Sequence, residues 1–424
     1  MMIYKISKPT KNLKGSVALT ASKSESNRIL IIQALCKDKF EIKNLADAQD
    51  TQTLRTILQL TTHPEYSGSR LKTSYDVGPA GTTMRFLTAY LSTLQRTITL
   101  TGSGRMHERP IRILVDALRQ LGAKITYLEK EGFPPLSIEG NLLKGGEIEI
   151  EGNISSQYIS ALLLITPALF NGLIIKFKGA IVSRPYIDMT LKVMENFGIY
   201  GQWQENTISV SSQNYSLPEA NYTYTVEADW SAASYWYAMA ALSDEVDLHI
   251  TGLRKNSLQG DAVIADLFSF FGVHTEYTAD GVRLSKRKFL TQHFGFDFSD
   301  CPDIAQTIAV VVSALKIPSM LTGLQTLKIK ETNRIEALCN ELGKISISAK
   351  EAMPDVLEIQ EFQDTLISPP TPLLTYNDHR MAMALTPLVM KLGELKIENP
   401  EVVKKSYPNF WEDLKSVGFL IEEL

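Results

Sequence analysis

The stretch Leu118-Arg119-Gln120-Leu121-Gly122-Ala123, followed by a strand-like run over residues 124–128, decides the fold of this chain. Its glycine is typical of a helix that ends in a left-handed residue before the chain turns into a strand. The same shape returns with glycines at positions 198, 272, 343 and 418, at spacings of 76, 74, 71 and 75 residues. One further unit fits before Gly122, with a helix over residues 54–60 and no closing glycine. This period predicts six copies of one supersecondary unit along the chain.

Within each unit the sequence predicts both strands and helices. Polar and apolar residues alternate over residues 97–101 and 147–151, which predicts strands, and residues 111–121 predict a helix. The fold class is therefore α/β. The alternative to a true repeat is that helix–glycine–strand joints recur in any α/β protein.

The composition is that of an ordinary globular protein. The chain has 424 residues, 44% hydrophobic and 21% charged, and its length predicts two or more domains. A formal net charge of −4 gives no basis for binding nucleic acid or an anionic membrane. The most apolar run, residues 159–170, is broken by Pro167 and is shorter than the roughly 20 residues that a spanning helix needs. Three dispersed cysteines and an N-terminal region without a signal-like apolar stretch favour a cytoplasmic protein.

Common cofactor signatures are missing, but five segments place Lys or Arg beside hydroxyl, amide or glycine residues at an expected element boundary. The chain has no G-x-x-x-x-G-K-[ST], no G-x-G-x-x-G after a strand and no H-E-x-x-H, which disfavours nucleotide kinases, dinucleotide oxidoreductases and zinc peptidases. Helix-terminal N–H groups, small hydroxyls and a cation together satisfy an oxyanion, so such segments suit phosphate and carboxylate groups. The alternative is a set of ordinary capped helices with solvated cations. The segments are residues 22–28, 78–86, 106–110, 329–334 and 376–385.

Some of these segments carry specific expectations. Thr82 is expected to cap the helix that follows Gly81, and Arg109 to stand at the mouth of the next helix. Lys330 and Arg334 are four residues apart, so on a helix they would share a face that an anion could bridge. Asp303 precedes an apolar run and is either a helix cap or a poised general base.

In order along nearly the whole chain, these segments resemble the family of 5-enolpyruvylshikimate-3-phosphate synthase (3-phosphoshikimate 1-carboxyvinyltransferase), an enolpyruvyl transferase family. Further matching motifs are residues 155–157, 183–186 and 256–261. The resemblance implies an α/β fold of two lobes, each made of three βαβαββ repeat units in an inside-out α/β barrel, with a hinged cleft. The first lobe would comprise residues 1–19 and 229–424, and the second residues 20–228.

The reaction that the resemblance implies transfers the enolpyruvyl group of phosphoenolpyruvate to the 5-hydroxyl of shikimate 3-phosphate and releases phosphate. This step belongs to the shikimate pathway to aromatic amino acids, and it needs no metal and no organic cofactor. By position, Asp303 would be the general base, and Lys23 and Glu331 would deliver the proton to C3. The residues holding shikimate 3-phosphate would be Lys23, Ser24, Arg28, Ser155, Ser156, Gln157, Ser183, Tyr186, Asp303 and Lys330. Those holding phosphoenolpyruvate would be Lys23, Gly81, Arg109, Gln157, Arg334, Arg380 and Lys405.

The chain departs from the family pattern at four positions. Pro79, Phe86, His107 and Thr326 stand where an Asn, a Pro, an Arg and a polar amide are common. Gly81 leaves room beside phosphoenolpyruvate, so the resemblance implies inhibition by glyphosate, with a strength that depends on the first two departures. The implied partners are the two small substrates, and the implied state is a monomer.

Two alternatives stay open at this point. UDP-N-acetylglucosamine enolpyruvyl transferase shares the implied fold and reaction type, but it typically carries a Cys in the loop that matches residues 101–109, where this chain has none. A non-catalytic anion-binding protein of the same fold would be favoured by the loss of Asp303, Glu331 or Lys23, and all three are present. Phosphate release from phosphoenolpyruvate with each acceptor distinguishes the three.

Overall fold

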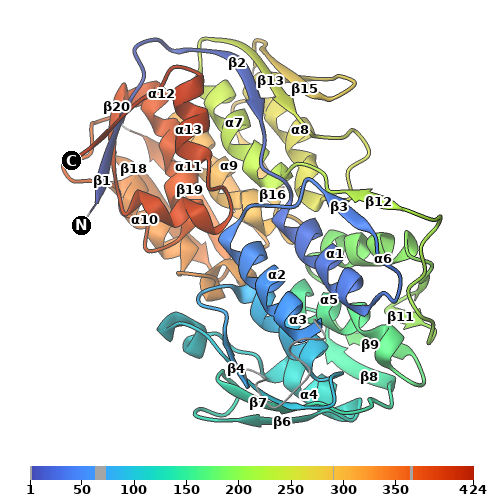
Figure 1. Cartoon of the computed structure of the whole chain (residues 1–424). Coiled ribbons are helices and arrows are strands. Elements are labelled where there is room, and N and C mark those ends of the chain that lie inside the picture. The colour runs from blue at the N-terminus through green and yellow to red at the C-terminus, as the bar shows by residue number, and fades with distance from the viewer. Residues whose placement is uncertain (1, 63–72, 290, 363–365) are drawn as a thin grey trace. The chain divides into compact units, whose positions relative to one another are not determined.

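The structure is a computed structural model that describes residues 2–62, 73–289, 291–362 and 366–424. The chain forms two compact units (Figure 1), of which the first combines Met1–Ala21 with Glu227–Leu424 and the second is Ser22–Val226. The first unit is therefore discontinuous in sequence. The second is one continuous segment inserted into it.

Four sheets of the described residues share one topology. In each, the first two strands in chain order run parallel, and the third and fourth strands add antiparallel in the spatial order first, second, fourth, third. In the sheet that begins with β2, the whole second unit separates the first strand from the second in sequence. The second unit holds two of these sheets. In spatial order, one sheet consists of β4 (Ser74–Asp76), β5 (Thr97–Thr101), β7 (Leu136–Glu139) and β6 (Lys124–Tyr127). The other consists of β8 (Gly146–Glu151), β9 (Leu173–Lys178), β11 (Thr207–Val210) and β10 (Gly201–Gln204). The first unit holds the other two. In spatial order, one sheet consists of β2 (Asn12–Ala18), β13 (Glu245–Thr251), β15 (Gly281–Lys286) and β14 (Val273–Tyr277). The other consists of β16 (Phe294–Asp297), β17 (Ser319–Thr322), β19 (Val356–Phe362) and β18 (Ile347–Met353).

Two smaller sheets bring the number in the described residues to six, three in each unit. In the first unit β1 (Ile3–Ser7) pairs with both β20 (Glu394–Glu398) and β21 (Leu420–Glu423), so the N-terminal strand completes a sheet built from the C-terminal end of the chain. In the second unit β3 (Glu41–Lys43) pairs in parallel with β12 (Thr223–Thr225). The repeat and the α/β fold class predicted from sequence are confirmed.

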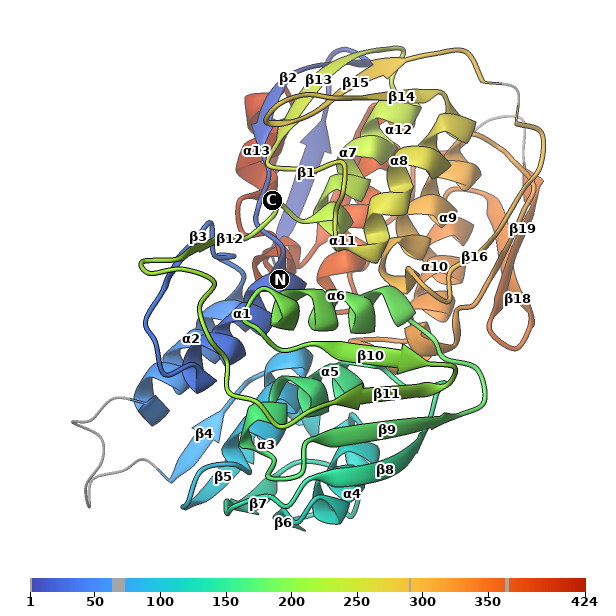
Figure 2. The same cartoon turned by 90° about the vertical axis from the view of Figure 1, so that its right-hand side faces the viewer.

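Fully buried helices form the centre of the first unit. Every residue of α7 (Trp230–Leu242) except Ser231 is buried, and α9 (Ala305–Ala314) and α11 (His379–Leu385) are buried throughout. A helix that is apolar on all sides has no face suited to water and must lie inside. Figure 2 shows these helices inside the unit, with the β2–β13–β15–β14 sheet and the β18–β19 hairpin at its periphery. Its remaining α-helices are α8 (Ile264–Leu267), α10 (Arg334–Gly343), α12 (Val389–Leu392) and α13 (Phe410–Ser416).

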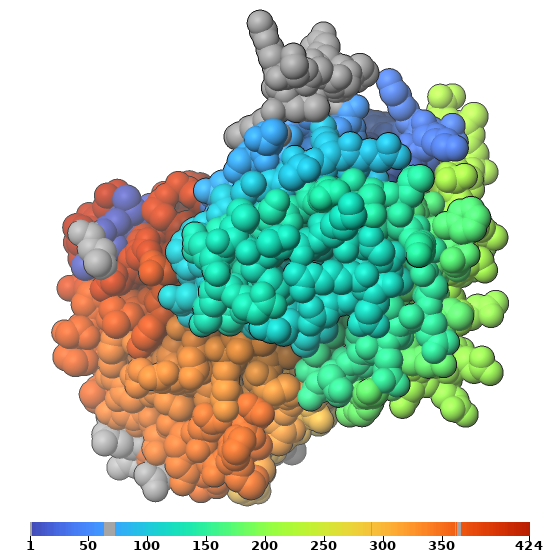
Figure 3. All heavy atoms as spheres, turned by 90° about the horizontal axis from the view of Figure 1, so that it is seen from below, coloured from blue at the N-terminus to red at the C-terminus, as the bar shows by residue number. Residues whose placement is uncertain are grey.

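The second unit repeats this arrangement with α3 (Gly81–Leu91) and α5 (Ser156–Leu164) as its most buried helices and α1 (Lys23–Leu35) buried from residue 25 to 32. The helices α2 (Gln49–Thr62), α4 (Arg112–Gln120) and α6 (Arg184–Glu195) each bury one apolar stripe. The strands alternate buried and exposed residues, as in β9, so each sheet keeps one face outward. In Figure 3 the β6–β7 region, in teal, forms part of the outer surface of this unit.

The predicted glycine helix ends are confirmed at four positions and wrong at one. The backbone is left-handed, with φ of 77 to 104°, at glycines 122, 198, 272 and 418. Gly343 is instead the last residue of α10, and Lys344, in a right-handed conformation, follows it as the C-cap. Among the described helices, none has both the length and the apolar character needed to cross a bilayer.

Candidate functional site

The candidate residues of both units gather at the amino ends of helices. In the first unit Asp303 lies in the 3₁₀ turn Pro302–Ile304 just before α9, Arg334 is the first residue of α10, and Arg380 lies in the first turn of α11. In the second unit Lys23 and Gly81 are the first residues of α1 and α3. Helix amino ends carry unsatisfied N–H groups and partial positive charge, so each unit offers its cations where anions are already favoured.

Asp303 is the acidic centre of the first unit's cluster. Its Oδ1 accepts hydrogen bonds from Lys330 Nζ at 3.4 Å and from Arg334 Nη1 at 3.3 Å, and its Oδ2 accepts one from Arg380 Nη2 at 2.8 Å. The side chain keeps 21% of its surface exposed. The N-cap position of α9 belongs to Ile304, so Asp303 does not occupy it. A carboxylate that contacts three cations and keeps part of its surface exposed is suited to meet a ligand.

Arg334 is the buried hub of this cluster, with a side chain only 1% exposed. Its guanidinium donates to both carboxylate oxygens of Asp378, with Nε to Oδ2 at 2.7 Å and Nη2 to Oδ1 at 3.3 Å, and Nη2 also donates to Glu331 at 3.0 Å. Burial alone would lower the pKa of Arg334, but Asp378, Glu331 and Asp303 outweigh it and raise that pKa above its usual value. The side chain is therefore a permanent cation.

Arg380 and Lys405 complete the positive charge. Arg380 Nη1 donates to the Tyr235 hydroxyl at 3.3 Å, and Lys405 from the 3₁₀ helix Pro400–Lys405 forms a short ion pair with Glu331. Burial would lower the pKa of Arg380, but Asp303 and the neighbouring acidic groups raise it well above its usual value. Burial lowers the pKa of Lys330, against the opposing influence of Asp303.

The expectation that Lys330 and Arg334 share a helix face is wrong. Lys330 follows the 3₁₀ helix Gln325–Ile329, and α10 begins only at Arg334 because the Asn333 side chain caps it by accepting from the Glu336 N–H at 3.4 Å. The two cations still meet, since both donate to Asp303 Oδ1. A shared carboxylate replaces the predicted shared face.

In the second unit Lys23 pairs with Asp50 at the start of α2. The Nζ–Oδ2 distance is 3.1 Å, and the side chains are 14% and 3% exposed. Ser22 caps α1 by accepting a hydrogen bond from the Glu25 N–H. The Thr83 hydroxyl donates to the Asp50 carbonyl at 2.8 Å, which ties the start of α3 to the start of α2.

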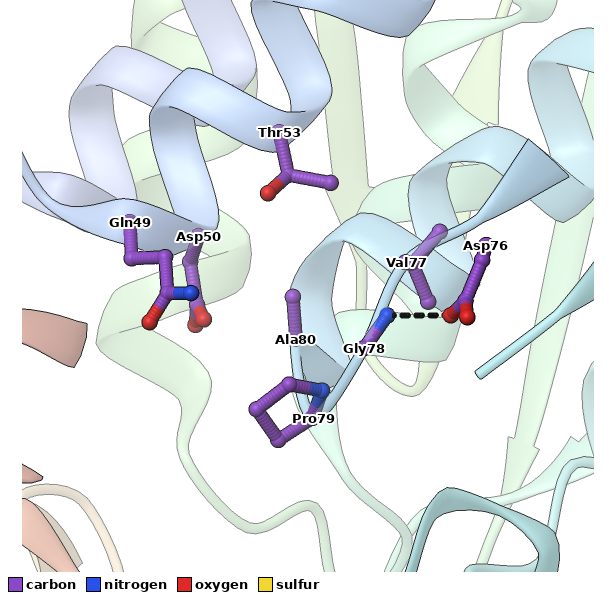
Figure 4. Close-up of a pocket in the computed structure, with 8 residues that line it drawn as sticks. All are labelled: Gln49, Asp50, Thr53, Asp76, Val77, Gly78, Pro79 and Ala80. Atoms are coloured by element: carbon purple, nitrogen blue, oxygen red, sulfur yellow. Dashed lines mark hydrogen bonds between the residues drawn. The ribbon is translucent and has the colours of Figure 1, made fainter. Parts of the chain in front are cut away.

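A pocket of about 270 Å³ adjoins this ion pair (Figure 4). Figure 4 shows Gln49 and Asp50 of α2 on one side and the turn Gly78-Pro79-Ala80 on the other. Pro79, where the resemblance implies an Asn, lines this pocket with an apolar ring. The expected Thr82 cap is wrong, since α3 begins at Gly81 after Ala80, without a side-chain cap.

Gly81 lies directly against the Arg109 guanidinium. A Cβ placed on Gly81 would lie 2.6 Å from Arg109 Nη1 and 2.7 Å from Nη2. The absence of a side chain at this position therefore allows Arg109, only 7% exposed, to lie beside the first turn of α3. Arg109 itself ends the 3₁₀ helix Gly104–Glu108, ahead of α4.

Arg28 and the serine segments form the other part of the second unit's cluster. The Arg28 side chain donates to the Thr190 hydroxyl at 2.7 Å, the Ser160 hydroxyl at 2.9 Å, and the carbonyls of Ser24 and Tyr186 at 2.7 and 3.0 Å. It is 3% exposed, and burial lowers its pKa to about 10. Arg28 thus joins the amino ends of α1 and α6 to the middle of α5.

The remaining predicted residues of this unit also lie at helix starts. Ser155 caps α5 by accepting from the Gln157 N–H at 3.4 Å, and Ser156 is the first residue of that helix. Ser183 precedes α6 in a left-handed conformation with φ of 54°, and Tyr186 lies in the first turn. Non-glycine residues adopt this conformation rarely, mostly where surrounding structure fixes it.

Each unit therefore brings together its own share of the predicted residues. The residues Asp303, Lys330, Glu331, Arg334, Arg380 and Lys405 form one cluster in the first unit, and the other predicted residues lie in the second unit. Sequence reasoning missed Asp50, Ser231 and Tyr235, because no local motif marks them. In the part of the chain that the structure describes, no group of three or more His, Cys, Asp or Glu side chains could hold a metal ion.

Comparison with known proteins gives one consistent result. The chain matches the family EPSP synthase (3-phosphoshikimate 1-carboxyvinyltransferase) over residues 7–414. It is 48% identical over 423 residues to a 3-phosphoshikimate 1-carboxyvinyltransferase of Bacteroides fragilis, covering 99% of each chain. It is 38% identical over 434 residues to the enzyme of that name from a Sulfurovum species, covering 97% of this chain and 98% of the relative.

Solved structures show the same fold. An EPSP synthase from Acinetobacter baumannii matches with a TM-score of 0.79 at 20% identity, covering the whole of both chains. The enolpyruvyl transferase NikO from Streptomyces tendae matches with a TM-score of 0.75 at 16% identity, covering 100% of this chain and 99% of the other. At these identities the likeness concerns the fold.

Proposed function

The chain belongs to the EPSP synthase (3-phosphoshikimate 1-carboxyvinyltransferase) family, and we propose that its two cationic clusters bind the two substrates of that family's reaction. The reaction transfers the enolpyruvyl group of phosphoenolpyruvate to shikimate 3-phosphate, a step of the shikimate pathway to aromatic amino acids. The observation that carries the assignment of roles is Asp303, a partly exposed carboxylate held by Lys330, Arg334 and Arg380.

Charge explains why the site needs so many cations. Both substrates are multiply anionic, and at an effective dielectric constant of about 20 each like-charge pair at about 4 Å costs roughly 4 kcal/mol. The first unit supplies four cations, Lys330, Arg334, Arg380 and Lys405, against the three carboxylates that they contact. An incoming phosphate or carboxylate can exchange with the internal carboxylates without leaving the cations unpaired.

The chemical steps follow from these groups. Asp303 takes the proton of the 5-hydroxyl of shikimate 3-phosphate while that oxygen attacks C2 of phosphoenolpyruvate. Lys23 and Glu331 share delivery of a proton to C3, which becomes a methyl group in the tetrahedral intermediate. As the bond from C2 to the phosphate oxygen breaks, one proton of this methyl group returns to the same pair, and the new enol ether and phosphate are formed. Arg109, Arg334, Arg380 and Lys405, with Gly81 and Gln157, hold phosphoenolpyruvate. Shikimate 3-phosphate is held by Ser24, Arg28, Ser155, Ser156, Ser183, Tyr186 and Lys330.

The two clusters lie in different units. We propose that the units correspond to the two lobes of the fold, with the chain crossing near Thr20 and Asp229. The thiols of Cys36, Cys301 and Cys339 are free, which supports a reducing, cytoplasmic location. A monomer is the proposed state.

One assay tests the proposed function against its nearest rival. The purified protein should release phosphate from phosphoenolpyruvate in the presence of shikimate 3-phosphate and not with UDP-N-acetylglucosamine. Release with the nucleotide sugar alone would assign the other enolpyruvyl transfer, and release with neither would assign an anion-binding protein without this activity.

Glyphosate should inhibit this reaction in competition with phosphoenolpyruvate. Its phosphonate and carboxylate groups suit the cations proposed for phosphoenolpyruvate, and Gly81 adds no side chain beside Arg109. Initial rates measured against both compounds should give a competitive pattern. A rate that stays flat into high millimolar glyphosate contradicts this prediction.

Gly81→Ala should weaken phosphoenolpyruvate binding without unfolding the protein. The new methyl group would displace the end of the flexible Arg109 side chain, which lies 2.6 Å from the Cβ position. Loss of one charged contact predicts a KM for phosphoenolpyruvate about 10-fold higher, with an unchanged melting temperature. Gly104→Ala is the matched control, because a Cβ there meets nothing within 4 Å. Equal KM values in both variants would refute the role of this contact.

A further inference from the structure

One motif that the proposed mechanism leaves without a role is the segment of residues 256–261, which ends at Asp261. Asp261 lies in the 3₁₀ helix Gly260–Val263 and is 1% exposed. Its carboxylate accepts a short hydrogen bond from the hydroxyl of Ser231, the second residue of α7. A buried carboxylate is costly unless it is hydrogen-bonded or near a cation, so this placement calls for a partner charge.

The Ser231 hydroxyl links Asp261 to one charge of opposite sign, that of Arg380. An ionised carboxylate can only accept, so the Ser231 proton is committed to Asp261, and the lone pairs of the hydroxyl remain for other donors. Arg380 Nη2 donates a hydrogen bond to the Ser231 hydroxyl oxygen at 3.4 Å. The three side chains thus form a line with a fixed direction: Arg380 donates to Ser231, and Ser231 donates to Asp261.

Arg380 makes two further side-chain contacts, and they explain why the hydrogen bond to Ser231 matters for its position. Its Nη2 also donates to Asp303 at 2.8 Å, and its Nη1 donates to the hydroxyl of Tyr235, which is on α7 like Ser231. In the proposed reaction Asp303 must turn to the substrate hydroxyl, so Arg380 loses its shortest contact at that moment. The two contacts to α7 then hold the guanidinium, and Asp261 keeps one of them oriented.

We propose that Asp261 and Ser231 are positioning residues that hold the Arg380 guanidinium for phosphoenolpyruvate. The inference rests on the proposed function, in which Arg380 binds that substrate. Ser231 and Asp261 act through Arg380, so their loss should change the binding of phosphoenolpyruvate and leave shikimate 3-phosphate binding unaffected.

Ser231→Ala is the first test. It removes the acceptor for Arg380 and should raise the KM for phosphoenolpyruvate about 5- to 10-fold, with kcat within about 3-fold and an unchanged KM for shikimate 3-phosphate. Ser231→Thr keeps the hydroxyl and should restore the KM. Ser243→Ala is the matched control, because that serine is the buried C-cap at the opposite end of the same helix, where its hydroxyl donates to the backbone carbonyl of Met239 at 2.7 Å.

Asp261→Asn separates positioning from direct contact with the substrate. The variant removes the negative charge that orients Ser231, so it should raise the same KM, and the double variant should resemble Ser231→Ala alone because both residues act in one line. Additive effects, or an unchanged KM for phosphoenolpyruvate in Ser231→Ala, would overturn the inference. A wild-type protein that releases no phosphate would instead overturn the proposed function, so the two failures are distinguishable.

Discussion

Replacing Asp303 with alanine is expected to lower kcat about 10²–10⁴-fold, the usual effect of losing a general base. The structure adds an expectation for binding. The variant would leave Lys330, Arg334 and Arg380 without the carboxylate that they share, so the cluster would gain one net positive charge. Phosphoenolpyruvate should then bind no more weakly, so its KM should not rise.

Two further variants make this result specific. Asp303→Asn keeps the size of the side chain and removes the base, so its kcat should fall by a similar factor. Asp300→Ala removes an exposed carboxylate three residues earlier and should leave the rate unchanged. Steady-state kinetics with each substrate varied in turn would measure all three. Near-wild-type turnover in Asp303→Ala would rule out its role as the base.

The repeated fold was predictable because its signals are local. Five of the six repeat units carry the same helix–glycine–strand pattern in sequence. Helices such as α7 lack a polar face, so sequence alone places them inside. The caps at Ser22 and Asp378 follow from short-range chemistry in the same way. The prediction of a helix through Lys330 was wrong, because the Asn333 side chain caps α10 and the helix therefore begins only at Arg334.

The candidate site was predictable in its cations and less so in their partners. The motifs marked Arg334 and Arg380, but nothing near them in sequence indicates that Asp303 is their common acceptor, 31 and 77 residues away along the chain. The same holds for Asp50 beside Lys23 and for Asp261 behind Ser231. These pairings depend on how the repeats pack, which a single sequence does not reveal without its fold.

Replacing Arg334 with methionine is expected to reduce the free energy of unfolding of the first unit by about 3–5 kcal/mol, the cost of removing one partner from a buried ion pair. Arg334 is 1% exposed and donates to Asp378, Glu331 and Asp303. Its loss would leave the fully buried Asp378 carboxylate without its bidentate partner. Arg334→Lys would keep the charge without the planar fork, so it should recover only part of the loss.

Urea unfolding followed by tryptophan fluorescence suits this measurement, because three of the four tryptophans, Trp230, Trp236 and Trp411, belong to the first unit and only Trp203 belongs to the second. The double variant Arg334→Met with Asp378→Asn removes both members of the pair and should be more stable than Arg334→Met alone, since no unpaired buried charge remains at Asp378. Because Arg334 is also proposed to hold phosphoenolpyruvate, the double variant should regain stability without regaining affinity for that substrate. A wild-type unfolding free energy in Arg334→Met would show that the hub contributes nothing to the fold. A full return of phosphoenolpyruvate affinity in the double variant would show that Arg334 acts on the site only through folding.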